Sequence, residues 1–190
     1  MVRGTAEIIA VSAPSGTGKT TIVKKVLIEF PEIVFSVSAT TRKKRDNEVH
    51  GREYFFLSEE EFKQKIKDDE FIEWEQFYDY YYGTFKSFVD ENINAGKPVL
   101  LEVDVKGALS LKCIYPGAHL IYILPPSQEE LIERLTKRQT ETPQDLQKRI
   151  ERAKMELSLK DKFDYFVVNK DLEVAVKEVK SLIKNILYKE

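Results

Sequence analysis

The stretch VSAPSGTGKTTI, residues Val11–Ile22, decides how the rest of this sequence is interpreted. An apolar run ends just before it at Ala10, and apolar residues recur at helical spacing just after it. A strand, a glycine-rich turn and a helix in that order are the context of the pattern G-x-x-x-x-G-K-[ST], which the Gly-Lys-Thr at 18–20 closes. The first position of the pattern holds Ala13 instead of glycine, and alanine is small enough to stand where the chain leaves a strand.

This pattern predicts a loop that binds phosphate. Glycines allow successive backbone N–H groups to converge on one point, because a Cβ atom would block the positive φ angles that such a wrap requires. A helix that begins at about Gly18 would direct its positive end toward the same point. Lys19 would add a cation on a long stem, and Thr20 a hydroxyl able to join the coordination of Mg²⁺. The alternative, a strand, turn and helix without a ligand, does not require Gly-Lys-Thr in that order.

Length and composition limit the other possibilities. A chain of 190 residues suits a single domain with inserted lobes. Thirty Lys and Arg residues against 32 Asp and Glu leave a net charge of −2, so we expect no broad basic surface for nucleic acid. Cys113 is the only cysteine, which excludes an internal disulfide and a cysteine-based zinc site. The sequence lacks a long apolar run and the features of a signal peptide, so we expect a cytoplasmic protein without a membrane partner.

Buried strands alternate with helices along most of the chain. Beyond the first strand, apolar runs recur at 34–38, 99–103, 119–124 and 163–168. Helical periodicity fills most of the intervals between them. This alternation predicts an α/β fold in which a central parallel sheet is covered by helices on both faces.

Side-chain caps mark where the helices are expected to begin. They are Ser58-x-x-Glu61, Ser127-x-x-Glu130 and Thr142-Pro143-x-Asp145. Gly96 is expected to end a helix over 84–95, and the last helix is expected over 172–187.

Two segments do not follow the alternation of strands and helices. From about 40 to 83 the chain has short β-like pieces around one helix, which indicates a small inserted α+β lobe. From about 125 to 160 two helical segments rich in Arg and Glu form a candidate lid. The core would then consist of residues 1–39, 84–124 and 161–190. A lobe and a lid beside the glycine-rich loop (residues 13–20) are expected of an enzyme that closes over its substrates.

The segment SVSATTRKKR, residues 36–45, places two arginines just beyond a strand. Arg42 and Arg45, with the hydroxyls of Ser38, Thr40 and Thr41 near them in sequence, could hold a phosphate through forked hydrogen bonds. Taken alone, the segment favours the alternative, a solvated basic loop.

The segment DDEFIEWEQFYDYYYGT, residues 68–84, contains the carboxylate Glu73 inside an apolar and aromatic strand. Such a residue ordinarily faces water, and if it faces inward it needs hydrogen-bond donors. The aromatic residues that follow are expected to form the core of the lobe, with at most one or two hydroxyls reaching a ligand: Phe77, Tyr78, Tyr80, Tyr81 and Tyr82.

The segment VLLEVDVKG, residues 99–107, is an apolar strand that ends in Glu102 and Asp104. Acids at the carboxyl end of a central parallel strand lie beside a phosphate loop, where they orient metal-bound water or accept hydrogen bonds from a substrate. This segment therefore favours a functional role for both carboxylates.

The candidate lid carries three arginines of interest, Arg134, Arg138 and Arg149. Arg134 and Arg138 lie four residues apart and share one face of a helix. Taken alone, pairing with nearby glutamates such as Glu130 explains them better than a role in a site.

Together these stretches resemble the guanylate kinase family of P-loop nucleoside monophosphate kinases. The resemblance runs from Glu7 to about Leu187 and rests on SAPSGTGKTT, SVSATTRKKR with EVHGREYFF, FIEWEQFYDYYYGT, LLEVDVKGA, RLTKR with Arg149, and VVNKDL. It implies a five-stranded parallel sheet, a lobe that binds GMP, a helical lid, and the reaction ATP + GMP ⇌ ADP + GDP with Mg²⁺. Lys43-Lys44 stands where the family often has a proline, and Glu102 where aspartate is common.

The resemblance also implies roles for individual residues. The GMP phosphate would be held by Ser38, Arg42, Arg45, Tyr54 and Tyr82, and guanine would be read by Glu73 and Thr84. Glu102 and Asp104 would lie near GMP and the metal, which Thr20 would hold with their help through water. The residues expected to bind ATP are Ser12, Ala13, Pro14, Ser15, Gly16, Thr17, Gly18, Lys19, Thr20, Thr21 and Asn169. Catalysis would depend on Lys19, Arg134, Arg138 and Arg149.

Three other functions compete with this interpretation at the level of the sequence. Guanylate kinase-like modules that bind peptides without catalysis tend to lose the phosphate loop, which is intact here. A GTPase is suggested by Asn169-Lys170-Asp171, but the guanine-reading pattern N-K-x-D fails because residue 172 is Leu. A kinase for another small phosphorylated acceptor would use the same frame.

Overall fold

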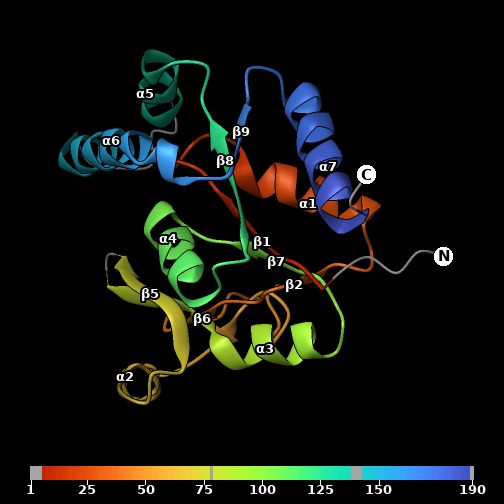
Figure 1. The fold of residues 1–190 in the computed structure, drawn as a ribbon. Coiled ribbons are helices and arrows are strands. Elements are labelled where there is room, and N and C mark those ends of the chain that lie inside the picture. Colours follow the sequence, from red (N-terminus) through yellow and green to blue (C-terminus); the bar gives the residue numbers. More distant parts are fainter. Residues whose placement is uncertain (1–5, 78, 138–142, 189–190) are drawn as a thin grey trace.

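The computed structural model describes residues 6–77, 79–137 and 143–188, and within them it contains two sheets (Figure 1). The larger sheet is parallel throughout, with the strand order β2-β7-β1-β8-β9. Its strands are β1 (Ile8–Ser12), β2 (Val34–Phe35), β7 (Val99–Glu102), β8 (His119–Leu124) and β9 (Tyr165–Val168). The predicted five-stranded parallel sheet is therefore confirmed.

The helices occupy most of the intervals between the strands of this sheet. They are α1 (Lys19–Glu29), α2 (Glu59–Lys67), α3 (Lys86–Asn94), α4 (Val105–Ile114), α5 (Gln128–Thr136), α6 (Pro143–Ser158) and α7 (Leu172–Tyr188), with a 3₁₀ turn at Lys160–Lys162. Over the described part of the chain, none of them combines the length and the apolar character that crossing a membrane requires.

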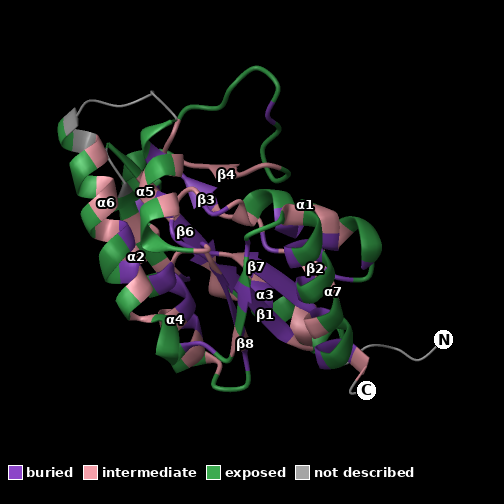
Figure 2. Cartoon of the chain, turned by 90° about the horizontal axis from the view of Figure 1, so that it is seen from above, coloured by how far each residue is buried: buried purple, intermediate pink, exposed green. Residues whose placement is uncertain are grey.

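Alternation along the strands sorts their side chains onto two buried faces. Ile9 and Val11 of β1 pack toward α1 and α7, whereas Ile8 and Ala10 pack toward α3 and α4. Figure 2 shows the buried residues concentrated along the sheet between these helices. Because both faces are covered, β1 is buried at every position and is apolar from Ile8 to Val11, before Ser12.

The strands of the smaller sheet come almost entirely from the predicted lobe. Its strands, in the order β4-β3-β6-β5, are β4 (Phe55–Phe56), β3 (Ala39–Thr40), β6 (Tyr80–Phe85) and β5 (Phe71–Phe77). Helix α2 packs against it through Phe62, whose ring stacks on Phe71 at 4.5 Å between centroids. The prediction that Tyr80 belongs to the core of the lobe is wrong, because this residue is 40% exposed. Tyr81 does pack against the buried cluster that contains Phe62 and Phe71. Tyr78 lies outside the described residues.

Some predicted boundaries differ from the structure, and the strand expected over 163–168 begins only at Tyr165. The helix expected over 84–95 begins only at Lys86, because Thr84 belongs to β6, where it pairs with Glu73 of β5. Gly96 ends this helix as predicted, with φ of 73° and its N–H donating to the carbonyl of Ile93. The strand expected over 34–38 stops at Phe35, and the carbonyl of Ser38 accepts a hydrogen bond from Phe55 of the smaller sheet.

The other helix signals are confirmed where the structure describes them. Ser58 forms a complete capping box with Glu61, and Ser127 accepts a hydrogen bond from the N–H of Glu130. Thr142, the third predicted cap, lies outside the described residues. The last helix ends within one residue of its predicted end and buries the predicted apolar stripe.

Candidate active site

The glycine-rich loop joins β1 to α1 at the carboxyl end of the larger sheet. Gly16 and Gly18 have φ angles of 94° and 87°, which only glycine adopts readily. The amide of Asn169 donates a hydrogen bond of 2.6 Å to the carbonyl of Thr17. A Cβ atom on Gly18 would lie 2.9 Å from that amide nitrogen, so the loop leaves no room for a side chain there.

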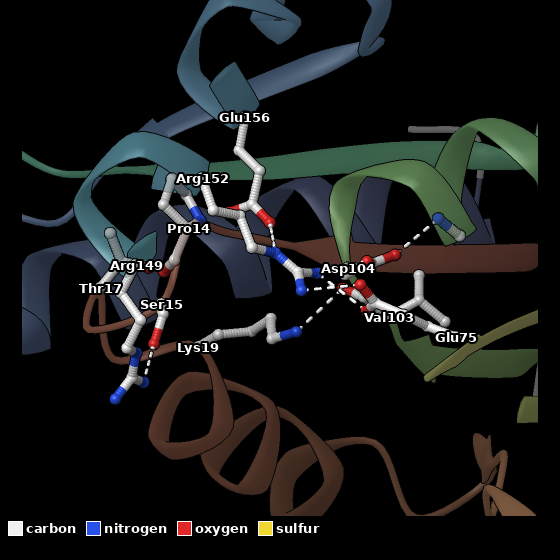
Figure 3. Close-up of polar contacts among 11 residues, drawn as sticks. Pro14, Ser15, Thr17, Lys19, Glu75, Val103, Asp104, Arg149, Arg152 and Glu156 are labelled. Atoms are coloured by element: carbon white, nitrogen blue, oxygen red, sulfur yellow. Dashed lines mark hydrogen bonds and ion pairs between the residues drawn. The ribbon is translucent and has the colours of Figure 1, made fainter. Parts of the chain in front are cut away.

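This loop forms one side of a cavity of about 350 Å³. The opposite side is lined by Glu75, Asp104, Arg149, Arg152 and Glu156, which come from β5, the turn between β7 and α4, and α6. Figure 3 shows Arg152 directed toward Glu75, Asp104 and Glu156, and Arg149 directed toward Ser15 of the loop. The cavity therefore brings together four segments that are far apart in the sequence.

Lys19 and Thr20 extend from the first turn of α1 toward the end of β7. The ammonium of Lys19 donates a hydrogen bond of 2.8 Å to the carbonyl of Val103 and lies 4.0 Å from the Oε1 of Glu102. Burial lowers the pKa of Lys19, and the charges of Glu102 and Asp104 oppose that shift. Thr20 donates a hydrogen bond of 2.5 Å to the Oε1 of Glu102. A cation, a hydroxyl and a carboxylate thus meet at one point.

The arginines of the predicted lid occupy different positions. The Nη2 of Arg149 donates a hydrogen bond of 2.5 Å to the Oγ of Ser15 in the glycine-rich loop. Arg134 pairs with Glu130 at 2.5 Å, as the alternative interpretation expected, and also donates to the carbonyl of Asn169 at 3.2 Å. Arg138 lies outside the described residues.

A second cavity, of about 270 Å³, lies between the two sheets, and predicted GMP-side residues line it: Ser38, Tyr54, Glu73, Tyr82, Glu102 and Asp104. Glu73 faces inward and accepts a hydrogen bond of 2.7 Å from the hydroxyl of Thr84. Burial raises the pKa of Glu73 to about 7, and the charges of Asp104 and Glu75 add to the rise. The carboxylate is thus partly buried at the wall of the cavity, and its hydroxyl partner comes from the neighbouring strand.

Arg42 and Arg45 lie near this second cavity but outside its lining. Arg42 donates a hydrogen bond of 2.7 Å to the Oε1 of Glu48, and its guanidinium lies 5.4 Å from the ring centre of Tyr54. The other oxygen of Glu48 accepts a hydrogen bond from the backbone N–H of Arg45 at 2.8 Å. Only 15% of the Arg42 side chain is exposed, so this residue is not part of a simply solvated loop.

Four charged residues of the site escaped the sequence analysis: Glu48, Glu75, Arg152 and Glu156. Three of them carried a local signal. Glu75 follows Glu73 by two residues on a strand, which places both on one side, and Arg152 and Glu156 are four residues apart on a helix. No local pattern relates Arg152 to Glu75, which it meets from 77 positions away.

The family model for guanylate kinase matches residues 5–186 of the chain. The chain belongs to the guanylate kinase family. A guanylate kinase of Thermotoga maritima is 48% identical over 179 residues, which cover 94% of this chain and 86% of that protein. One from Prochlorococcus marinus is 44% identical over 178 residues, covering 94% and 97%. The predicted guanylate kinase family is therefore confirmed.

A solved guanylate kinase structure agrees with this assignment. The crystal structure of the guanylate kinase from Anaplasma phagocytophilum matches with a TM-score of 0.75 at 29% sequence identity. The match covers 97% of this chain and 87% of the other. The predicted P-loop kinase fold is confirmed by this match and by the parallel sheet.

Proposed function

We propose that this chain is a guanylate kinase that transfers the γ-phosphoryl group of ATP to GMP, giving ADP and GDP. The observation that carries this proposal is that the two cavities share a wall. Glu75 and Asp104 line both the cavity at the glycine-rich loop and the cavity that holds Glu73. A donor in the first cavity and an acceptor in the second would therefore meet end to end, as phosphoryl transfer requires.

The first cavity suits the phosphates of ATP. Its positive-φ glycines and the start of α1 direct backbone N–H groups and a partial positive charge toward the bound anion. Lys19 would follow the transferring phosphoryl group, with Arg149 and Arg138 joining it from the lid. Asn169 would act on the ATP side by bracing the loop through Thr17.

The second cavity suits GMP. Guanine presents two adjacent donors, N1–H and the 2-amino group, which an ionised Glu73 would accept side by side. The hydroxyl of Thr84, next to Glu73, would serve the O6 acceptor. Ser38, Tyr54 and Tyr82 would hold the phosphate of GMP together with Arg42 and Arg45, and Glu102 and Asp104 would lie near the nucleotide.

Mg²⁺ fits the point where the two cavities approach each other. Thr20 and Glu102 supply a hydroxyl and a carboxylate in contact, and oxygen ligands are what this ion prefers. Among the described residues no group of three or more His, Cys, Asp or Glu side chains could hold a metal. ATP phosphates and water, oriented by Glu102 or Asp104, would therefore complete the coordination. Bound there, the ion would neutralise charge on the phosphates.

We assign a role to each part of this single domain. Residues of about 40–83 form the GMP lobe, and residues of about 125–160 form the lid. The rest of the chain, 1–39, 84–124 and 161–190, forms the core. The lobe and the lid each have their own small apolar cluster, which supports treating them as separate movable parts. We place the enzyme in the cytoplasm, where its nucleotide substrates are found.

A coupled assay of ADP release tests the proposal directly. GMP, IMP and AMP are offered in turn as acceptors, with and without Mg²⁺. We expect Mg²⁺-dependent turnover that is fastest with GMP. Comparable turnover with AMP would favour a kinase for another acceptor, and GMP binding without turnover would favour an inert binding module.

A further inference from the structure

Arg152 of the lid helix α6 contacts three carboxylates that belong to three parts of the molecule (Figure 3). Its Nη1 and Nη2 donate to the two oxygens of Glu75, on β5 of the lobe, at 2.7 and 2.8 Å. Its Nη2 also lies 2.7 Å from the Oδ2 of Asp104, in the core. Its Nε donates to Glu156, one turn further along α6, at 2.8 Å. One guanidinium thus joins lid, lobe and core.

The contact with Glu75 has the geometry of a strong ion pair. Two parallel N–H···O bonds match the planar fork of arginine to a carboxylate, which fixes orientation as well as distance. The side chains of Arg152 and Glu75 are 30% and 34% exposed, so water screens this pair less than it screens an open surface pair. Glu156 holds the guanidinium from its own helix, which limits the rotamers that Arg152 can adopt.

The two acids that Arg152 contacts on the other side are placed to transmit its position. Glu75 and Asp104 form the wall shared by the two cavities. Glu75 lies on the same side of β5 as Glu73. Asp104 accepts a hydrogen bond of 2.6 Å from the N–H of Gly107 at the start of α4, and a Cβ on Gly107 would lie 3.0 Å from Glu73. A shift of α6 would therefore displace Glu75 and Asp104 and so change the wall of the proposed GMP cavity.

The same helix is tied to the ATP side one turn earlier. Arg149 donates to Ser15 of the glycine-rich loop, and Arg152 follows three residues later on α6. A ligand that fixes the loop and Arg149 would fix the position of Arg152 as well. The helix is thus a mechanical link from the donor cavity to the acceptor cavity.

We infer that Arg152 is a positioning residue that couples ATP binding to GMP binding through its paired hydrogen bonds with Glu75. The inference rests on the proposed function of the two cavities. When α6 is held on the ATP side, Arg152 orients Glu75 and Asp104 and so prepares the GMP cavity. Coupling of this kind is reciprocal, so GMP strengthens ATP binding by the same factor.

The test measures GMP affinity by calorimetry in the presence and absence of a non-hydrolysable ATP analogue with Mg²⁺. The variants are Glu75→Gln, Arg152→Gln and the double variant, and Lys154→Gln is the matched control. Lys154 is an exposed residue of the same helix. Its replacement therefore removes a positive charge from α6 without removing any contact of Arg152. Glu75→Gln leaves Arg152 with Asp104 and Glu156, which keeps the test informative if Arg152→Gln folds poorly. Thermal unfolding of each variant checks the fold.

In the wild type and in Lys154→Gln, the analogue should tighten GMP binding by about fivefold or more. In Glu75→Gln and Arg152→Gln that ratio should fall to about one to twofold, and the double variant should match the single ones, because both changes remove one interaction. A purely structural role would weaken GMP binding equally with and without the analogue. An unchanged ratio in both single variants, or a ratio of one in the wild type, overturns the inference. Failure of the wild type to bind GMP would contradict the proposed function itself.

Discussion

Lys19 is the residue whose removal tests the glycine-rich loop most directly. Its ammonium lies between the carbonyl of Val103 and the carboxylate of Glu102, where it would neutralise charge that moves during phosphoryl transfer. Lys19→Ala should fold normally and lose about 10²–10³ in kcat, the loss typical of one charge-stabilising donor. A coupled assay measures this, with Lys24→Ala, a change at an exposed residue of the same helix, as the control. A variant that keeps most of the wild-type kcat would contradict the role given to the loop.

Glu73 should determine which nucleotide is accepted. Adenine presents an acceptor at N1, so Glu73 would face a lone pair across a desolvated gap, and the site should reject AMP by roughly 10⁴-fold relative to GMP. IMP keeps N1–H and lacks the 2-amino group, so it should fall between them. Glu73→Gln replaces one acceptor by a donor and should narrow the preference for GMP. The measurement is kcat/KM for the three acceptors, and an unchanged GMP to AMP ratio in the variant would refute the assignment.

The same carboxylate should make GMP binding depend on pH. Burial, with help from Asp104 and Glu75, raises the pKa of Glu73 to about 7, and only the ionised form accepts both guanine donors. GMP affinity should therefore rise as the pH increases toward about 7 and level off above it. The phosphate of GMP titrates near about 6 and adds its own step. Calorimetry measures GMP affinity across this pH range, and in Glu73→Gln it should find only the step due to the phosphate. Identical pH profiles of the wild type and the variant would contradict the prediction.

Among the elements, the turn between β1 and α1 depends on backbone conformation as much as on charge. Gly18→Ala would place a Cβ at φ 87° and 2.9 Å from the amide of Asn169. Gly96→Ala is the matched control, because its φ is 73° and nothing lies within 4 Å of the added carbon. Both changes should cost about 1–2 kcal/mol of unfolding free energy from backbone strain. Only Gly18→Ala should also abolish binding of an ATP analogue, and equal binding by both variants would contradict this.

The elements of the core could be predicted from the sequence, whereas those of the lobe could be predicted only in part. A strand such as β8 is apolar after His119 because helices cover both faces of the sheet, and a helix such as α7 repeats its apolar residues with a period of 3.6 residues. Strand β6 carries no such signal. On β6 the aromatic Tyr80 is exposed whereas the polar Thr84 is buried, so the aromatic residues do not indicate which face of the strand is buried. The segment is a strand because it pairs with β5, and that pairing is not encoded in the local sequence.

For the molecule as a whole, the sequence indicates which residues carry the chemistry and leaves open how they meet. The role of Lys19 and Thr20 can be predicted from the sequence because one short loop contains the whole phosphate-binding pattern. The role of Arg152 and Glu75 cannot be predicted in this way, since their contact exists only after α6 and β5 are brought together by the fold. A contact between distant segments is set by tertiary structure, which local spacing does not encode.

The lobe and the lid should move as units when both substrates bind. The lobe is held together by Phe62 and Phe71, and the lid by Leu131, Leu135 and Ala153, so each keeps its shape while its position changes. The polar contacts that join them to the rest, such as the one between Arg152 and Glu75, are partly exposed and can break and re-form. Their closure would exclude water from the phosphoryl group, which would otherwise be open to hydrolysis.

Small-angle scattering can measure this closure in solution. The radius of gyration should fall when GMP and a non-hydrolysable ATP analogue are both added, and each ligand alone should give a smaller change. Arg149→Ala is the informative variant, because it removes the hydrogen bond between α6 and Ser15 while leaving the apolar contacts of the lid intact. It should bind both ligands and compact less than the wild type. A radius of gyration that does not change in the wild type with both sites filled would show that the lobe and the lid do not close over the substrates.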